Sequence, residues 1–115
     1  MKYVLLGTLA PGAMKKQATR TANARSKLKE LGIRLESLHY TQGAYDFVDV
    51  VEAPSAESIL AFSVWYAEHG YGKVLTMPAF DERTMVKALQ KSGIRGGASA
   101  KRVRFRAGKE QKDSF

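Results

Sequence analysis

The stretch that decides the fold is Tyr40-Thr41-Gln42-Gly43-Ala44-Tyr45-Asp46-Phe47-Val48-Asp49-Val50-Val51-Glu52-Ala53-Pro54. Gly43 tolerates the positive φ that tight turns require. Residues 45–52 are rich in aromatic and β-branched side chains, which are typical of strands. Pro54 ends that strand, and Ser55 is a preferred N-cap residue for a following helix. The stretch therefore predicts a turn, a strand and the start of a helix.

The same signals divide the rest of the chain. Apolar and alternating runs predict three more strands, over residues 2–9, 33–40 and 73–80, with a bulge near Glu36 and Ser37 in the second of these. A first helix is expected to begin between residues 14 and 21 and to end at Gly32. Its inward face, at i, i+4 and i+7, consists of Ala24, Leu28 and Leu31. A second helix is expected over residues 55–69 and a third over residues 81–91, capped by Asp81.

This order of elements predicts an α+β fold. A β-α-β-β-α-β sequence is the ferredoxin-like arrangement, in which two helices pack on one face of a four-stranded antiparallel sheet, here followed by an extra helix. Yet both faces of the predicted strands are apolar: Tyr3 and Leu5 alternate with Val4 and Leu6. Because the helices cover only one face, we expect a second copy to cover the other in a homodimer or a higher homo-oligomer.

Length, charge and composition narrow the classes of function. The chain has 115 residues, no cysteine and a net charge of +8. We expect one domain over residues 1–93 and a flexible basic tail over residues 94–115. The lack of cysteine excludes disulfides and thiol nucleophiles. No apolar run is long enough to span a membrane, and the short run after Lys2 is expected to be a strand rather than a leader, which favours the cytoplasm.

Part of the sequence resembles the GYD domain family. The resemblance covers roughly residues 1–93 and lies in Lys2-Tyr3-Val4-Leu5-Leu6-Gly7, residues 40–48, Val51-Glu52-Ala53-Pro54 and Ala79-Phe80, with the Gly-x-Tyr-Asp step at Gly43 as its most specific part. His39 and Gln42 depart from the family's pattern, which has an aromatic and an apolar residue there. The resemblance implies a dimeric α+β barrel of uncharacterised function, and it supplies no catalytic residues.

His39 and Asp46 are the candidate catalytic pair. A hairpin loop of two or four residues sets them directly opposite each other, where the carboxylate favours the protonated imidazole and makes it a general base near neutral pH. A loop of three residues instead sets Arg34 opposite Glu52 and Leu38 opposite Val48. In a third alternative Asp46 only accepts hydrogen bonds from turn amides.

Aromatic residues suggest a small-molecule pocket between the sheet and the helices. Related dimeric barrels often bind ligands there, and some are monooxygenases that need no bound cofactor; this analogy rests on the fold alone. The alternative is that the same side chains belong to the core or to a dimer interface. The candidate pocket residues are Tyr40, Tyr45, Phe62, Trp65 and Tyr66.

Nucleic-acid binding and metal binding are weaker hypotheses. The RNA recognition motif has the same order of elements and stacks bases on strand aromatics, where this chain has Tyr3, Tyr45 and Phe47. Asp49 on that face would repel phosphates. The tail could follow a phosphate backbone through Lys101, Arg102, Arg104 and Arg106, or remain solvated.

His69 is expected to cap the second helix. We predict no metal and no cofactor.

Three functions are therefore ranked. The leading one is a small-molecule-binding or accessory homodimer. The alternatives are a cofactor-independent monooxygenase- or isomerase-like enzyme and a nucleic-acid-binding module that uses the basic tail.

Overall fold

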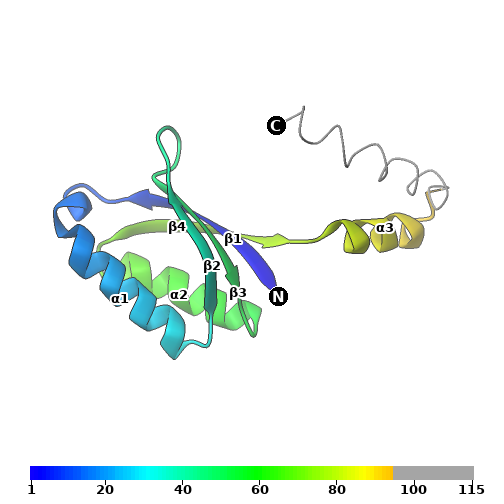
Figure 1. Ribbon diagram of the computed structural model, residues 1–115, viewed down its shortest axis with the longest axis horizontal. Helices are drawn as coiled ribbons and strands as arrows, with labels where there is room; N and C mark the ends of the chain where they lie inside the picture. The colour runs from blue at the N-terminus through cyan, green and yellow to red at the C-terminus, as the bar shows by residue number, and fades with distance from the viewer. Residues whose placement is uncertain (95–115) are drawn as a thin grey trace. The chain divides into compact units, whose positions relative to one another are not determined.

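A computed structural model describes residues 1–94 of the chain (Figure 1). Its contacts divide the chain into two units, residues 1–79 and residues 80–115. The first unit contains β1 (Lys2–Leu9), a 3-10 turn η1 (Ala13–Lys16), α1 (Gln17–Glu30), β2 (Arg34–Tyr40), β3 (Phe47–Glu52), α2 (Ala56–Glu68) and β4 (Gly72–Ala79); the second begins with α3 (Glu82–Lys91). No helix within residues 1–94 is long and apolar enough to cross a membrane.

The four strands form one antiparallel sheet in the order β2-β3-β1-β4. Both long helices of the first unit, α1 and α2, pack against the same face of this sheet (Figure 1). This is the ferredoxin-like α+β fold that the order of elements predicts.

Strand alternation divides the side chains between the two faces of the sheet. The inner face, beneath α1 and α2, carries Tyr3 and Leu5 from β1 and Phe47 and Val51 from β3, all at most 5% exposed. The intervening residues point the other way, since successive side chains of a strand lie on opposite faces. We call that side the outer face; its apolar residues are Val4, Leu6, Val48, Val50, Leu75 and Met77, which are paired across the strands.

The pairing of β2 with β3 corrects the expected hairpin. His39 lies opposite Val48, not opposite Asp46, and Leu38 lies opposite Asp49, not opposite Val48. The predicted bulge near Glu36 is confirmed, as is the pairing of Arg34 with Glu52. On the Tyr40 side of the bulge, both predicted registers are wrong.

The cause is a longer loop, residues 41–46, which Asp46 holds in place. Its backbone N–H donates to the Gly7 carbonyl at 2.7 Å, and its carboxylate accepts from the Leu9 N–H at 2.7 Å. The Thr41 N–H donates to the Asp46 carbonyl. Asp46 therefore ties the loop to the end of β1, so β3 begins at Phe47 and not at residue 45.

Local signals set the helix ends as predicted. The Ser55 hydroxyl accepts from the Ser58 N–H, and the Ser58 hydroxyl in turn accepts from the Ser55 N–H, which forms a capping box at the start of α2. Gly32 follows the end of α1 with φ 73°, a left-handed conformation that glycine adopts without strain. In the second unit, the Asp81 carboxylate caps α3 by accepting from the Thr84 N–H at 2.8 Å.

Gly7 gives a direct test of the packing between β1 and β3. A Cβ atom on Gly7 would lie 1.9 Å from the Phe47 ring, so Gly7→Ala forces that ring out of its place. We expect a loss of about 1–3 kcal/mol in the free energy of unfolding, measured by urea denaturation. Thr8→Ala, at an exposed position of the same strand, is the control and should change stability by no more than about 0.5 kcal/mol. Equal effects of the two substitutions would contradict this packing.

Candidate functional site

A polar cluster lies inside the first unit, between the helices and the sheet. It consists of Arg20 on α1, Asp49 on β3 and Tyr66 on α2, which are 3%, 7% and 1% exposed. Burial of charged side chains is costly unless each charge is paired and hydrogen-bonded. Two charged side chains and a tyrosine hydroxyl in the core of a small domain therefore mark this cluster as the candidate functional site.

Hydrogen bonds run from the cluster towards the surface. Arg20 Nη1 donates to the Tyr66 hydroxyl at 3.1 Å, and Arg20 Nη2 donates to the side-chain oxygen of Gln17. Gln17 Nε2 donates in turn to the Tyr40 hydroxyl at 2.7 Å. The chain of contacts thus connects a buried tyrosine with Tyr40, whose side chain is half exposed.

Two buried atoms of the cluster are left without partners. Within residues 1–94, neither Arg20 Nε nor Asp49 Oδ1 has a hydrogen bond, and neither residue forms an ion pair. A buried donor or acceptor that is not paired costs roughly 1–3 kcal/mol, so almost all such groups in proteins have a partner. These two atoms are one donor and one acceptor that a bound molecule could satisfy.

The environment changes the acidity of three groups. Burial raises the pKa of Asp49 from 3.8 to about 6, against the opposing influence of Arg25 and then Arg20. Burial also raises the pKa of Tyr66. The hydrogen bond with Thr21, followed by that with Gln17, lowers the pKa of Tyr40. Asp49 can therefore exchange a proton close to neutral pH, as a general acid or base must.

A cavity of about 30 Å³ adjoins the cluster beneath α1, which is room for one or two water molecules. Its lining includes Arg20, Tyr40, Phe47 and Tyr66, with leucines from α1 and β2. An open groove of about 380 Å³ begins next to it and shares Arg25, Leu28 and Leu35 with the cavity. We call this the basic groove, because its other lining residues include the cations Lys29 and Arg34.

Helix α1 covers the cavity with few fully buried side chains, although hydrogen bonds from Arg20 to Tyr66 and from Asn23 to Tyr71 also hold it. Of its residues, Arg20 and Leu28 alone are fully buried. The adjoining groove has a volume within the range of ligand pockets.

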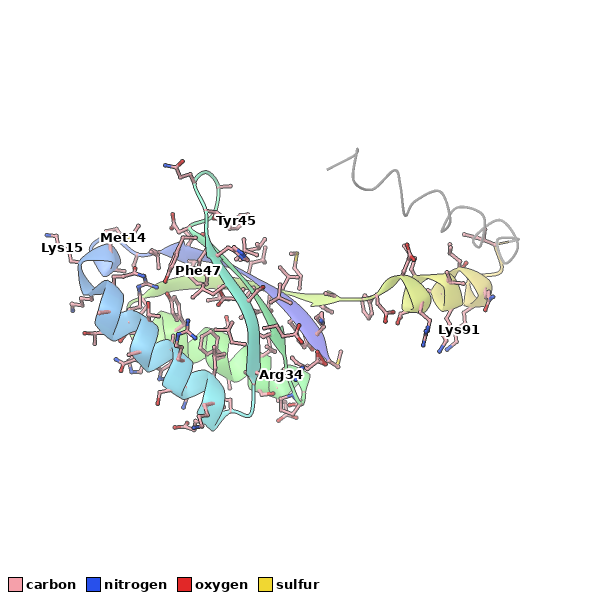
Figure 2. The ribbon with its side chains drawn as sticks, in the orientation of Figure 1. Met14, Lys15, Arg34, Tyr45, Phe47 and Lys91 are labelled. Carbon is pink, nitrogen blue, oxygen red and sulfur yellow. The ribbon has the colours of Figure 1, made fainter. Side chains whose placement is uncertain are left out.

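The structure brings only part of the predicted pocket together. Tyr40 and Tyr66 line the cavity, with Phe47 beside them. Phe62 and Trp65 belong instead to the core, stacked with ring centroids 5.8 Å apart. Tyr45 lies in the hairpin loop, and Phe47 begins the strand that follows it (Figure 2).

The candidate pair His39 and Asp46 is not brought together. His39 lies on the outer face, opposite Val48, and is exposed. The Asp46 carboxylate accepts from the Leu9 N–H at the end of β1, so its role is structural, although the donor is not a turn amide as in the third alternative. The separation follows from the longer hairpin loop described above.

The base-stacking hypothesis is also wrong. Tyr3 and Phe47 are 5% and 4% exposed and lie beneath the helices, where no base can reach them. The basic residues Lys101, Arg102, Arg104 and Arg106 lie outside the described residues. His69 is the C-cap residue of α2, with Nδ1 3.0 Å from the Trp65 carbonyl.

Asp49 and Arg20 were missed as site residues, although the sequence carries a signal for each. In Phe47-Val48-Asp49-Val50-Val51, Asp49 has the same parity as Phe47 and Val51, so it must point inward with them. Arg20 lies one turn before Ala24, on the inward stripe of the first helix.

Comparisons with known proteins agree with this architecture. The family model described as the GYD domain matches residues 3–89. The curated proteins contain no match. A similar solved structure is 5-chloro-2-hydroxyhydroquinone dehydrochlorinase from Burkholderia phenoliruptrix AC1100 in complex with 2,5-dihydroxybenzoquinone. It has a TM-score of 0.52 and 15% sequence identity, covering 70% of this chain and 94% of that chain. At 15% sequence identity, this similarity is evidence for the fold alone.

The buried carboxyl group predicts a pH dependence of stability. The pKa of Asp49 is higher in the folded chain than in the unfolded chain, so between about pH 4 and pH 6 the folded chain binds more protons. The contribution of Asp49 to the free energy of unfolding therefore decreases as the pH rises through this range. Asp49→Asn removes this contribution. We expect the variant to gain on the order of 2 kcal/mol relative to the wild type between pH 4 and pH 7, measured by urea denaturation.

Glu68→Gln, at an exposed position of α2, is the matched control and should follow the wild type. If Asp49→Asn instead lost stability at pH 7 relative to pH 4, the carboxylate would be stabilised by the fold, and its assignment as a group with a raised pKa would be wrong.

Proposed function

The chain belongs to the GYD domain family, and we propose that it is a small-molecule-binding or accessory protein that acts as a homodimer, with its ligand beneath α1 beside the polar cluster. The location that the sequence favours, the cytoplasm, stays a prediction.

The observation that carries the proposal is the pair of unpartnered buried atoms, Arg20 Nε and Asp49 Oδ1. A purely structural core replaces such groups with apolar ones, because leaving them unpaired costs stability. Arg20 lines the cavity, whereas Asp49 is buried in the same cluster without lining it. A ligand whose polar end reaches both residues would satisfy the two atoms while its apolar part contacts Phe47 and the leucines of the cavity. Pockets that combine apolar walls with a few convergent polar groups are typical ligand sites.

The fold neighbour supports this size of ligand. That protein is a dehydrochlorinase in complex with 2,5-dihydroxybenzoquinone, a single ring with polar substituents. A ring of this size is larger than the cavity of about 30 Å³ but small compared with the basic groove that adjoins it. We therefore propose that binding displaces the side chains of Arg25 and Tyr40 at the edge of α1.

The outer face supports the homodimer. Its apolar residues run across three strands, and Leu75 and Met77 are 49% and 38% exposed. Charges of both signs lie at its edge, where Lys2 pairs with Glu36 at 2.7 Å. A surface that carries an apolar centre and both signs of charge is complementary to itself, as a two-fold interface requires. The occupant that we propose is therefore a second copy of this chain.

An isomerase-like enzyme is the second candidate, and Asp49 is the observation that favours it. A carboxyl group with a pKa of about 6 beside a guanidinium can accept a proton from a bound molecule while the guanidinium stabilises the resulting anion. A monooxygenase-like activity, the other enzyme considered, has no such specific support among residues 1–94.

Ligand binding is tested by nuclear magnetic resonance with phenol as the probe. Phenol should cause saturable shifts in the backbone amides of Ala24, Leu38 and Phe47, which surround the cavity. Leu60 and Val64, on the exposed side of α2, should not shift. Shifts confined to the outer face, or no saturable shifts at all, would contradict the proposed site.

The homodimer is tested by light scattering. The wild-type chain should have about twice the 12.7 kDa mass of one chain, whereas Leu75→Glu combined with Met77→Glu should give monomers, because it places charges in the apolar interface. Leu60→Glu combined with Val64→Glu, two exposed apolar residues of α2, is the matched control and should remain dimeric. A monomeric wild type would overturn the homodimer.

A further inference from the structure

We infer that the ligand is a small unsaturated ring that carries an ionisable hydroxyl group, that Arg20 binds its oxygen as the anion, and that Asp49 holds the proton. This inference rests on the proposed binding site and adds the chemical class of its ligand and the roles of two residues.

The hydrogen-bond partners of Arg20 indicate that the bound ligand is an anion. Its terminal nitrogens donate to neutral partners, Tyr66 and Gln17, and its Nε is unpartnered within residues 1–94. No carboxylate of those residues forms an ion pair with this guanidinium, although it is 3% exposed. A buried cation without a contacting anion is expensive. An anionic oxygen on Nε would supply both the missing hydrogen bond and the missing charge.

The surrounding charges favour the same sign of ligand. The charges that oppose the raised pKa of Asp49 are Arg25 and Arg20, both from α1. Tyr66 from α2 lies in the same cluster. Strand β2 contributes Tyr40, and the residues paired with Asp49 are the apolar Leu5 and Leu38. The basic groove adds Lys29 and Arg34 at the entrance. Arg34 is paired with Glu36 at 3.1 Å, so the cations here without a paired carboxylate within residues 1–94 are Arg20, Arg25 and Lys29. These three still leave an excess of positive charge, which attracts an anion.

The walls favour a flat ring. Phe47 and Tyr66 meet edge to face, with ring centroids 5.9 Å apart, and both line the cavity. The remaining apolar walls are Leu28, Leu35 and Leu38. Aromatic rings pack favourably in stacked or edge-to-face arrangements against such side chains. A ring with one polar oxygen fits a site that is apolar along its walls and polar at one end.

Asp49 explains how a neutral compound becomes the bound anion. The O–H bond of the ligand breaks, its electron pair stays on the oxygen, and the proton moves to the Asp49 carboxylate. The products are a ligand anion on the guanidinium and a neutral carboxylic acid, so no charge is gained or lost and no other reactant is needed. Burial raises the pKa of Asp49, which reduces the cost of this transfer, and the Arg20 guanidinium stabilises the anion that is left.

The test uses 4-nitrophenol, whose anion is coloured, and 4-nitroanisole, which has the same ring without an ionisable hydroxyl. In mildly acidic buffer, where free 4-nitrophenol is mostly neutral, the wild-type chain should increase the visible band of the anion. It should bind 4-nitroanisole roughly tenfold more weakly. Arg20→Met should lose the anion band, and Arg83→Met, an exposed arginine of α3, should keep it.

The number of protons released on binding tests the role of Asp49 separately from the existence of the pocket. Calorimetry of 4-nitrophenol binding in two buffers of different ionisation enthalpy counts the protons released. Near pH 6.5 the wild type should release almost none, because Asp49 keeps the proton. Asp49→Asn should still bind the anion, but it should release nearly one proton for each neutral molecule bound. Glu68→Gln should match the wild type.

The outcomes distinguish this inference from the proposed function. Equal binding of both nitro compounds, without an anion band, would overturn the ligand class and leave the pocket in place. The same proton release from the wild type and from Asp49→Asn would overturn the role of Asp49. If neither nitro compound binds while phenol still shifts the cavity amides, the inference of an anionic ligand is wrong and the proposed binding site remains. If phenol causes no shifts either, the proposed function fails.

Discussion

The antiparallel pairing of β1 with β3 is the constraint on which the rest of the structure depends. It sets Tyr3 opposite Val51 and Leu5 opposite Asp49, and alternation then assigns every neighbouring side chain to one face or the other. A shift by one residue would exchange the two faces, so the apolar pattern specifies the register strongly. The same pairing carries Asp49 into the interior, which no local preference of an aspartate would do. The fold and the site therefore have a common origin.

Much of the fold could be predicted from the sequence because its signals are local. The Ser55 cap, the glycine after α1 and the bulge near Glu36 each depend on a few neighbouring residues. The hairpin could not, because its length is decided by the hydrogen bonds that Asp46 donates to Gly7 and accepts from Leu9, both remote in the sequence. Register at a hairpin is set by such contacts as much as by the turn itself.

The candidate site was less predictable than the fold, since charged residues are normally exposed. The alternation of side chains along β3 places Asp49 on the inner face of the sheet, and Arg20 lies on the inward stripe of α1. Charged side chains nevertheless favour the surface. The structure resolves this conflict by burying both and leaving one atom of each without a partner within residues 1–94. Conflicts between local preference and fold are expected at functional sites, where stability is given up for binding.

The most direct measurement is a crystal structure of the full chain with 4-nitrophenol. We expect electron density for the ring between α1 and the sheet, with its phenolic oxygen within hydrogen-bond distance of Arg20 Nε and of the Asp49 carboxyl group. Density for the ring at another place, with Arg20 and Asp49 contacting only water or each other, would contradict the claim that this cluster binds the ligand.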